Sequence, residues 1–445
     1  MPDAQHAANS FSSPGAASRA HNLTDLFDLL THQAYSEFGP ITQVAFYIGD
    51  GLQRAVTDGV FNLFEPATWA PANLCRLGSD ALKLSIQMSK LANPATLNLA
   101  WQELKNKLEI FILVINAQSI LKLPPSDTGE FIPIAELVPR AYSVPPFQAL
   151  WAVEGLGHYY ADSYHAHFGD PEGLLTEAKA KVPEKSLTML HAGMGLSFAD
   201  RLIGDLDPDD PSPTETRAAL EKFVSLCRSN SREGYLGCAI ESLGLVTRDF
   251  YPDLLDSVHE QLCQVAPELM GFFWHGAGRA LYFSRKYFLP VLTTVWKGID
   301  EEARACPDRE SAMAGLAWAL TVVNMRQPEI IHSALPSYTQ DASLGRGFAN
   351  GVTSTVIMRQ DTTPNEAFIS AFYQYRPDSD NQQSGEMWVR FAARPAQLGL
   401  EKYYPVLKQN NALDQVFRYQ DLAMLTADLE NQNLQQRSRR VMQLN

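Results

Sequence analysis

The stretch FFWHGAGRALYFSR, residues 272–285, decides the fold of this chain. It sets two glycines, Gly276 and Gly278, among aromatic and apolar residues and contains no proline, and we predict that it is helical. A glycine in the middle of a helix costs about 1 kcal/mol relative to alanine, so another interaction must recover that cost. Close contact between helices is the usual reason, and room beside a ligand is a less usual one.

The same pattern recurs along residues 147–359. Related segments are WAVEGLGHYYAD (151–162), MLHAGMGLSFADR (189–201), LGCAIESLGLVTR (236–248), GRGFANGVTSTVIMR (345–359) and the more degenerate AMAGLAWALTVVN (312–324). With Gly157, Gly195, Gly244 and Gly278 aligned, the intervals are 38, 49 and 34 residues, within the range of helical repeats. The predicted fold class is therefore all-α: a helical-repeat array or α/α toroid, curved around a cavity lined by glycine and aromatic residues. These G-x-G spacings follow no strand, so they do not predict a nucleotide-binding loop.

The regions on either side complete the predicted organisation. We expect a disordered lead-in over 1–22, an N-terminal helical region over 23–122, an extended proline-rich linker over 123–146, the helical-repeat region over 147–375 and a C-terminal extension over 376–445. Within the extension, MWVRFAARP (387–395) is predicted to form one short strand.

Composition narrows the class of protein. The 445 residues include 36 basic and 50 acidic ones, a net charge of −14. So acidic a surface repels phosphate backbones, which argues against nucleic-acid binding. The most apolar run, IFILVINA (110–117), is far shorter than the ~20 residues that cross a bilayer, so we expect no membrane span. The five scattered cysteines contain no C-x-x-C pair, which favours a cytoplasmic location over a disulfide framework.

Polar residues occupy matching positions in the repeats. Glu154, Glu241 and His275 each stand three residues before the aligned glycine, whereas His191 stands four before its own. If the array curves, these side chains converge on one concave surface. The residues predicted to carry chemistry are Glu154, His158, Asp162, His191, Glu241, His275 and Arg279. The side chains predicted to bind a ligand around them are Trp151, Tyr159, Phe198, Trp274, Tyr282 and Asn350.

Three interpretations of this constellation stay open. Glu154 and His158, four residues apart on one helix face, are placed to bind a divalent metal with His191, Glu241 or His275, because bundle metal sites are built from carboxylates and imidazoles on facing helices. Alternatively, a desolvated glutamate or histidine catalyses proton transfer. In the third interpretation, Glu154 and Glu241 form buried ion pairs with Arg201, Arg248 or Arg279 and knit the repeats together.

Several consecutive phrases resemble a known family. WHGAGRALYF (274–283), AGLAWALTVVNMRQPE (314–329) and FANGVTSTVIMRQDTTP (348–364) are similar to an uncharacterised bacterial family found in enediyne antibiotic gene clusters and elsewhere. The resemblance covers roughly residues 147–364. It implies a role in the biosynthesis of an antibiotic or another specialised natural product, beside enzymes that build long polyunsaturated chains, and it brings no catalytic residues with it.

Two functional hypotheses follow. The first is a cytoplasmic biosynthetic protein that binds or transforms a hydrophobic, unsaturated small molecule, as an isomerase or cyclase that uses acid–base groups or as a metal-assisted oxidoreductase. The rival is a non-catalytic helical scaffold that organises the partner proteins of a biosynthetic complex. A pocket enzyme encloses its aromatic residues, whereas a scaffold presents an apolar surface larger than a few hundred Å².

Overall fold

A computed structural model describes residues 94–126, 129–283, 295–303, 308–339, 342–377 and 382–444. The predictions for 1–22 and for most of 23–122 lie outside the described residues. Contacts divide the chain into two compact units, Met1–Gln102 with Phe283–Thr293, and Glu103–Tyr282 with Thr294–Asn445. The helices discussed below belong to the second, larger unit, apart from the first turns of the first helix and Phe283.

The described part of the chain is all-α and contains no strand, which confirms the all-α part of the predicted fold class, while the central cavity stays a prediction. The first half contains α5 (Pro94–Ile115), α6 (Ala117–Ile120), α7 (Ile134–Ala141), α8 (Pro146–Phe168), α9 (Leu187–Gly204), α10 (Pro213–Asn230), α11 (Leu236–Phe250), α12 (Leu255–Val265) and α13 (Met270–Phe283). Short turns η2 (Glu184–Ser186), η3 (Pro252–Leu254) and η4 (Pro267–Leu269) precede α9, α12 and α13.

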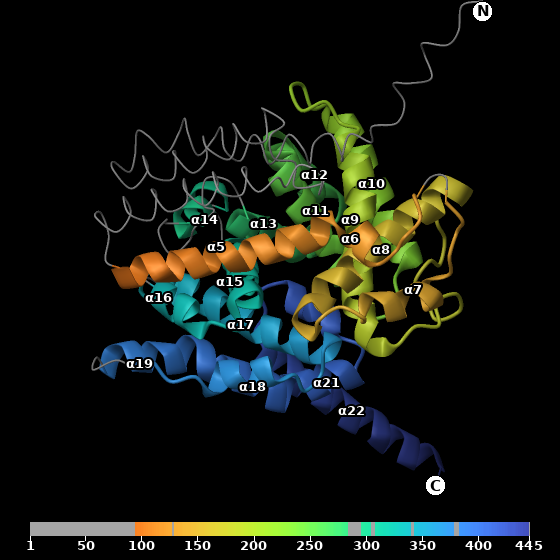
Figure 1. Ribbon diagram of the computed structural model, residues 1–445. Helices are drawn as coiled ribbons and strands as arrows, with labels where there is room; N and C mark the ends of the chain where they lie inside the picture. The colour runs from red at the N-terminus through yellow and green to blue at the C-terminus, as the bar shows by residue number, and fades with distance from the viewer. Residues whose placement is uncertain are drawn as a thin grey trace, which may run out of the picture. The chain divides into compact units, whose positions relative to one another are not determined.

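The second half is built in the same way. It contains α14 (Trp296–Glu302), α15 (Asp308–Asn324), α16 (Pro328–Tyr338), α17 (Ala342–Thr362), α18 (Ala367–Gln374), α19 (Gln382–Trp388), the π-helical segments η6 (Val389–Ala393) and η7 (Gly399–Tyr403), α20 (Arg394–Leu398), α21 (Tyr404–Gln409), η8 (Leu413–Phe417) and α22 (Leu422–Leu444). Figure 1 shows α22, in dark blue, extending away from the neighbouring helices. None of the described helices combines the length and apolar character of a membrane span.

The repeat helices α8, α9, α11, α13, α15 and α17 pack against one another in that order, and the contacts of α13 with α11 and α15 are made at Gly244, Gly276, Gly278 and Gly315. Glycines make each contact close. A Cβ on Gly157 would lie 2.3 Å from the Leu190 carbonyl oxygen of α9, and one on Gly244 would lie 1.8 Å from the Phe273 oxygen of α13. The structure thus confirms helix–helix approach as the reason for these glycines. Each aligned glycine faces the next helix of the series.

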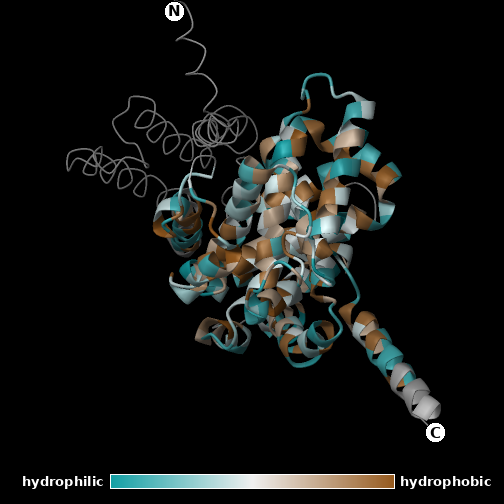
Figure 2. Ribbon diagram, turned by 90° about the vertical axis from the view of Figure 1, so that its right-hand side faces the viewer, coloured by the Kyte–Doolittle hydropathy of each residue, from teal (hydrophilic) through white to brown (hydrophobic). Residues whose placement is uncertain are grey.

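A second set of glycines faces the preceding helix. A Cβ on Gly193 would meet the Glu154 oxygen of α8 at 1.9 Å, and one on Gly276 would meet the Glu241 oxygen of α11 at 2.0 Å. Gly157 faces Leu190, Gly193 lies against the Glu154 oxygen and the His158 nitrogen, and Ser197 bonds to Asp162. Because the partner moves forward along α9 as the residue moves forward along α8, these two helices run parallel. Figure 2 shows apolar and polar residues sharing the same helices, as expected of helices packed on one side.

The series closes through α17. On α17, Thr355 and Arg359 both reach carbonyls of α15 at a constant offset of 37 residues, so these two helices run parallel. Arg359 Nη1 also donates to the Phe147 oxygen of α8 at 2.8 Å. Thr188 of α9 donates to Asp361 Oδ2 at 2.8 Å. The last repeat helix therefore contacts the first two.

Two local predictions were wrong. The linker over 123–146 is not extended throughout, because Ile134, Leu137, Val138 and Ala141 are buried at helical spacing and form one face of α7. The predicted strand MWVRFAARP lies instead in α19, η6 and α20. Its buried residues are Trp388, Ala392 and Ala393, four and five positions apart, which fits one face of a helix and not the alternation of a strand.

Candidate functional site

Four polar side chains meet in the interior between α8, α11 and α13. Arg279 lies at the centre and donates from Nη2 to Glu154 Oε1 at 2.5 Å and from Nη1 to Glu241 Oε2 at 3.1 Å. His275 Nδ1 lies 3.1 Å from Glu241 Oε1. All four residues are buried, and their side chains are between 0% and 8% exposed. They form a network that links two carboxylates through one guanidinium.

The glycine register explains why these residues meet. Glu154, Glu241 and His275 stand about one helical turn before glycines that contact the next helix, so their side chains follow that contact into the interior. His191 stands one residue further from its glycine, which rotates it by about 100°. Its Nδ1 lies 2.7 Å from the Leu187 oxygen, and its Nε2 accepts from the Arg232 amide at 3.0 Å.

The two carboxylates differ in how readily they hold a proton. Burial raises the pKa of Glu154, and Arg279 beside it only partly offsets this. Burial acts in the same direction on Glu241, but Arg279 and His275 together outweigh it and hold the pKa of that carboxyl below its usual range. Glu241 is therefore the ionised partner of Arg279. Glu154 is the carboxyl that more readily holds a proton.

The ionised Glu241 also sets the tautomer of His275. A carboxylate can only accept hydrogen bonds, so the proton between the two groups lies on Nδ1 of the imidazole. In the neutral ring, Nε2 is then an acceptor. This is the orientation that a carboxylate imposes on a histidine that works as a base.

A histidine–aspartate pair lies one helical turn along α8 from Glu154. His158 Nδ1 is 3.1 Å from Asp162 Oδ2, with the side chains 19% and 32% exposed. Ser197 of α9 donates to Asp162 Oδ1 at 2.6 Å and fixes that carboxylate. One face of α8 thus carries titratable groups from the buried Glu154 out to solvent.

The arrangement bears on the metal interpretation. Within the described ranges, no group of three or more His, Cys, Asp or Glu side chains is placed to hold a metal ion. The guanidinium of Arg279 occupies the place between Glu154 and Glu241 that a cation would need. Both ring nitrogens of His191 form hydrogen bonds with backbone groups, so neither is free to bind a metal ion. Burial also lowers the pKa of His191 to about 4.

The side chains predicted to bind a ligand have separate surroundings. The Trp151 ring lies 4.6 Å from the Arg359 guanidinium, Trp274 donates to His259, and Asn350 donates to the Gln420 oxygen. Phe198 lies under Arg201, and burial raises the pKa of Tyr159, which Ser163 beside it only partly offsets. These residues do not gather around the network. Trp318 and Phe417 contact His275 instead.

Tyr282 belongs to a second buried polar cluster. Its hydroxyl donates to Glu103 Oε1 at 2.9 Å and accepts from Asn324 Nδ2 at 2.8 Å. Lys107 Nζ lies 3.7 Å from the Tyr282 ring centroid and donates a hydrogen bond to the backbone carbonyl oxygen of Tyr282. Burial lowers the pKa of Lys107 to about 7. The sequence argument missed Glu103 and Lys107, although their four-residue spacing within an apolar helix was the available signal.

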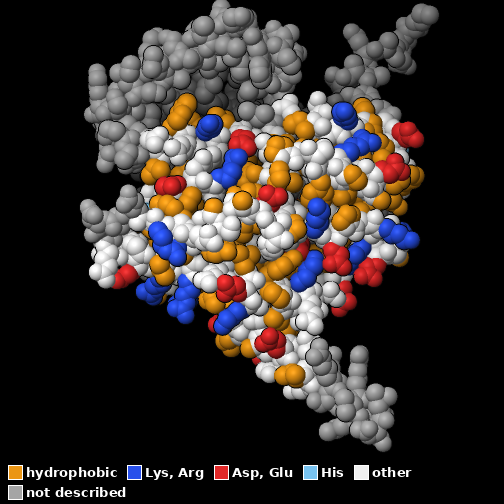
Figure 3. Space-filling view, turned by 60° about the horizontal axis from the view of Figure 1, so that its bottom comes forward, with side chains coloured by type: hydrophobic (Ala, Val, Ile, Leu, Met, Phe, Trp, Pro, Cys, Tyr) orange, Lys and Arg blue, Asp and Glu red, His pale blue; other side chains and the backbone are white. Residues whose placement is uncertain are grey.

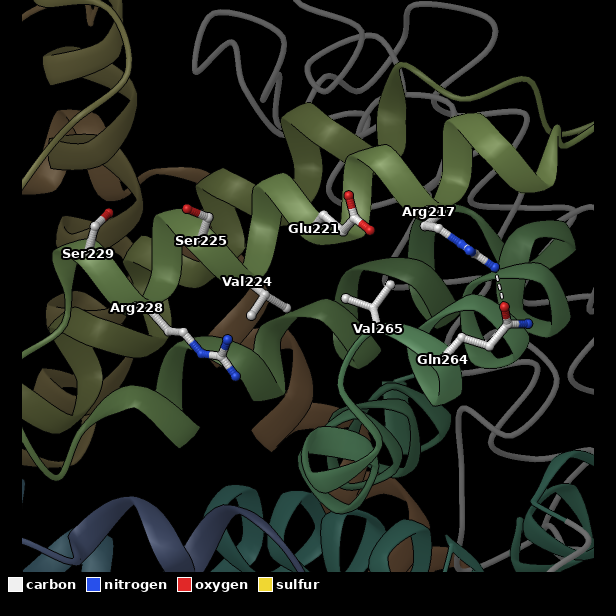
Figure 4. A pocket seen from close by; sticks show the side chains of 8 residues that line it. All are labelled: Arg217, Glu221, Val224, Ser225, Arg228, Ser229, Gln264 and Val265. Atoms are coloured by element: carbon white, nitrogen blue, oxygen red, sulfur yellow. Dashed lines mark hydrogen bonds between the residues drawn. The ribbon is translucent and has the colours of Figure 1, made fainter.

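A surface groove of about 650 Å³ lies between α10 and the end of α12 (Figure 4). Its lining residues are Arg217, Glu221, Val224, Ser225, Arg228, Ser229, Gln264 and Val265. Both arginines are engaged: Arg217 donates to Gln261 and Gln264, and Arg228 donates to Glu268. The groove contains none of the predicted site residues. On the face drawn in Figure 3, apolar and charged side chains are interspersed.

No family model, curated protein or solved structure was found to match this chain. The features of the structure that bear on catalysis are therefore the buried network and the histidine–aspartate pair.

Proposed function

We propose that the chain catalyses proton transfer on a hydrophobic, unsaturated small molecule. Glu154 is the acid, and His158, oriented by Asp162, is the base. The observation that carries the proposal is the pairing on one face of α8 of a carboxyl with a raised pKa and an imidazole held by a carboxylate. Two titratable groups whose environments separate their roles are the usual mark of an acid–base site.

The chemistry is an isomerisation or cyclisation. Glu154 donates its proton to one carbon of a double bond, which leaves a cation on the next carbon. His158 removes a proton from an adjacent carbon and a new double bond forms. His158, which is 19% exposed, then releases that proton to water and Glu154 takes one up, so both groups are restored and no other reactant is consumed. Arg279 stabilises the carboxylate that Glu154 becomes. Redox chemistry is not part of the proposal.

The substrate class and setting come from the family resemblance. That resemblance places such proteins beside enzymes of polyunsaturated chains, so the proposed role is a step of specialised-metabolite biosynthesis in the cytoplasm.

The test uses cis-parinaric acid, a conjugated tetraene fatty acid, as the probe in D₂O. Proton transfer at a double bond changes the ultraviolet absorbance of the tetraene and introduces deuterium, which mass spectrometry detects. We expect the wild-type protein to do both, and Glu154→Gln and His158→Gln to lose at least 100-fold in rate. His165→Gln, on the same helix and 41% exposed, is the matched control and should retain the wild-type rate.

Two results would overturn the proposal. One is a wild-type protein that neither shifts the absorbance nor adds deuterium. The other is deuterium incorporation at the same rate in Glu154→Gln and His158→Gln, which would place the chemistry elsewhere.

A specific observation also favours the scaffold hypothesis. On α5, Trp101 and Leu108 are 53% and 43% exposed, whereas Glu103 and Lys107 on the opposite face are buried along with the apolar Ala100 and Ile110. An apolar helix face in water is a surface for another protein. With a second copy of the chain as the first partner to test, light scattering should show association that Trp101→Lys with Leu108→Lys abolishes. A wild-type protein that stays monomeric at all concentrations contradicts a second copy as that partner.

A further inference from the structure

Three buried polar atoms near the network have no hydrogen-bond partner among the described residues. They are His275 Nε2, Arg279 Nε and Trp318 Nε1. The side chains are 0%, 4% and 0% exposed. Leaving a buried donor or acceptor unsatisfied costs about 1–3 kcal/mol each, so three together are a large cost to leave uncompensated.

The three side chains are neighbours. The Arg279 guanidinium carbon lies 4.5 Å from the Trp318 ring centroid, and the His275 and Trp318 centroids are 6.5 Å apart. Phe417 of η8 covers both rings, with centroid distances of 6.0 Å to His275 and 6.3 Å to Trp318. The three side chains therefore form one cluster on α13 and α15, with Phe417 packed against two of them.

The hydrogen-bonding character of the cluster selects its ligand. Arg279 Nε and Trp318 Nε1 can only donate, whereas His275 Nε2 accepts, because Glu241 holds the proton on Nδ1. A ligand must therefore accept twice and donate once. A carboxylate has no proton to donate, and an ammonium ion has no lone pair to accept with. A hydroxyl group has both.

We propose that His275, Arg279 and Trp318 bind one hydroxylic molecule, either water or a small alcohol. Its oxygen accepts from Arg279 Nε and Trp318 Nε1, and its proton is donated to His275 Nε2. Buried waters typically make about three such bonds to groups that are otherwise unsatisfied. The site is independent of the proposed proton transfer, since it uses different atoms of the network and stands even if Glu154 and His158 catalyse nothing.

The test is an NMR measurement on the full chain with ¹⁵N-labelled tryptophan. A water molecule bound at the site gives a nuclear Overhauser cross-peak between the water resonance and the Trp318 indole proton, with the sign of a rigidly held water. Trp388 is the matched control: it is equally buried, but its Nε1 donates to the Tyr375 oxygen at 3.1 Å. We expect a water cross-peak for Trp318 and none for Trp388.

Two further experiments assign the indole signals and identify the ligand. Trp318→Phe and Trp388→Phe each remove one indole signal. If Trp318→Phe does not fold, cross-peaks from the indole to the Phe417 ring assign it in the wild type. Adding ¹³C-methanol distinguishes the two sources, because a bound alcohol gives a cross-peak from its methyl protons. A Trp318 indole proton with no cross-peak to either molecule would sink the proposal.

Discussion

The interior contains two buried arginines that differ in almost everything except exposure. Arg279 is held by two carboxylates, Glu154 and Glu241. Arg359 is 0% exposed, donates to the Phe147 and Val322 carbonyl oxygens, and is surrounded by aromatic rings rather than acids. Burial lowers the pKa of Arg359 to about 9, with Arg326 adding to the effect, whereas the carboxylates raise the pKa of Arg279.

The difference separates two uses of a buried charge. Arg359 closes the helix series, and one of its bonds goes to a carbonyl in the last turn of α15, where the helix dipole favours a cation. Arg279 instead holds two acids together in the interior, one of which is inclined to keep its proton. The first arrangement suits a structural clamp. The second is the kind of coupled network from which acid–base sites are made.

Both arginines depend on the same close helix packing, so the largest effect should come from breaking it. Gly244→Ala would place a Cβ 1.8 Å from the Phe273 carbonyl oxygen. Because that oxygen belongs to the backbone, the clash can be relieved only if α11 moves away from α13. We expect no cooperative unfolding transition, or a loss of more than 4 kcal/mol. Gly155→Ala is the control: its Cβ would have ordinary contact at 3.8 Å, and calorimetry should show equal or greater stability. Equal stability of the two variants would contradict the packing assigned to Gly244.

The next largest effect separates the two arginines. Arg279→Met leaves Glu154 and Glu241 buried without their cation, and removing one partner of a buried pair costs about 3–5 kcal/mol. Chemical denaturation should show that loss at pH 7. Acidification should recover part of it, because protonation neutralises the stranded carboxyls. A loss below about 1 kcal/mol would mean that the two acids find other partners.

The repeat geometry was the predictable part of the fold. The spacing of the glycines predicts which helix faces meet, because a missing Cβ has one common use inside a helix. The sequence does not predict how the series closes. Closure depends on hydrogen bonds from Arg359 to backbone carbonyls 37 and 212 residues away. Every residue has a backbone carbonyl, so the sequence does not show which one Arg359 will bind. The strand predicted over 387–395 failed for a local reason, since alternation and four-residue spacing are hard to separate in so short a stretch.

The candidate site, like the fold, was predictable from the sequence only in part. The three-residue offset from the glycine predicts that Glu154, Glu241 and His275 converge, and they do lie in one network with Arg279. His191 shows the limit, because an offset of one residue turns a side chain to another neighbour. Phe417 had no signal at all: it comes from η8, which no repeat or motif places against the interior.

A smaller effect tests which carboxylate Arg279 depends on. Glu241→Gln at pH 7 should cost about 2–3 kcal/mol, because it removes the charge that both Arg279 and His275 bind. Glu154→Gln should cost less, since the raised pKa of Glu154 means that its ionisation opposes folding. Thermal melts of the two variants beside the wild type measure the order. Equal losses would contradict the assignment of Glu241 as the ionised partner.

The pH dependence of the two variants should have opposite signs. The pKa of Glu241 is depressed, so its contribution is present above its unfolded value of 4.5 and is lost as pH falls through the folded pKa. The pKa of Glu154 is raised, so its contribution is present below 4.5 and is lost as pH rises through the folded pKa. Melts from pH 3 to 8 should therefore show the deficit of Glu241→Gln shrinking in acid and that of Glu154→Gln growing.

The smallest effect should come from the second arginine. Arg359→Met removes a buried charge that has no acid partner, and methionine keeps most of the contact with Phe147 and Trp151. The Phe147 carbonyl lies in the first turn of α8 and already accepts within that helix, whereas the Val322 carbonyl in the last turn of α15 loses its donor. Against that loss, the desolvation cost of the guanidinium disappears. We expect a change within about 1 kcal/mol in chemical denaturation, far from that of Arg279→Met. A loss as large as that of Arg279→Met would show that aromatic rings and two carbonyls stabilise a buried guanidinium as much as two carboxylates do. That result would contradict the distinction between Arg359 as a structural clamp and Arg279 as part of an acid–base network.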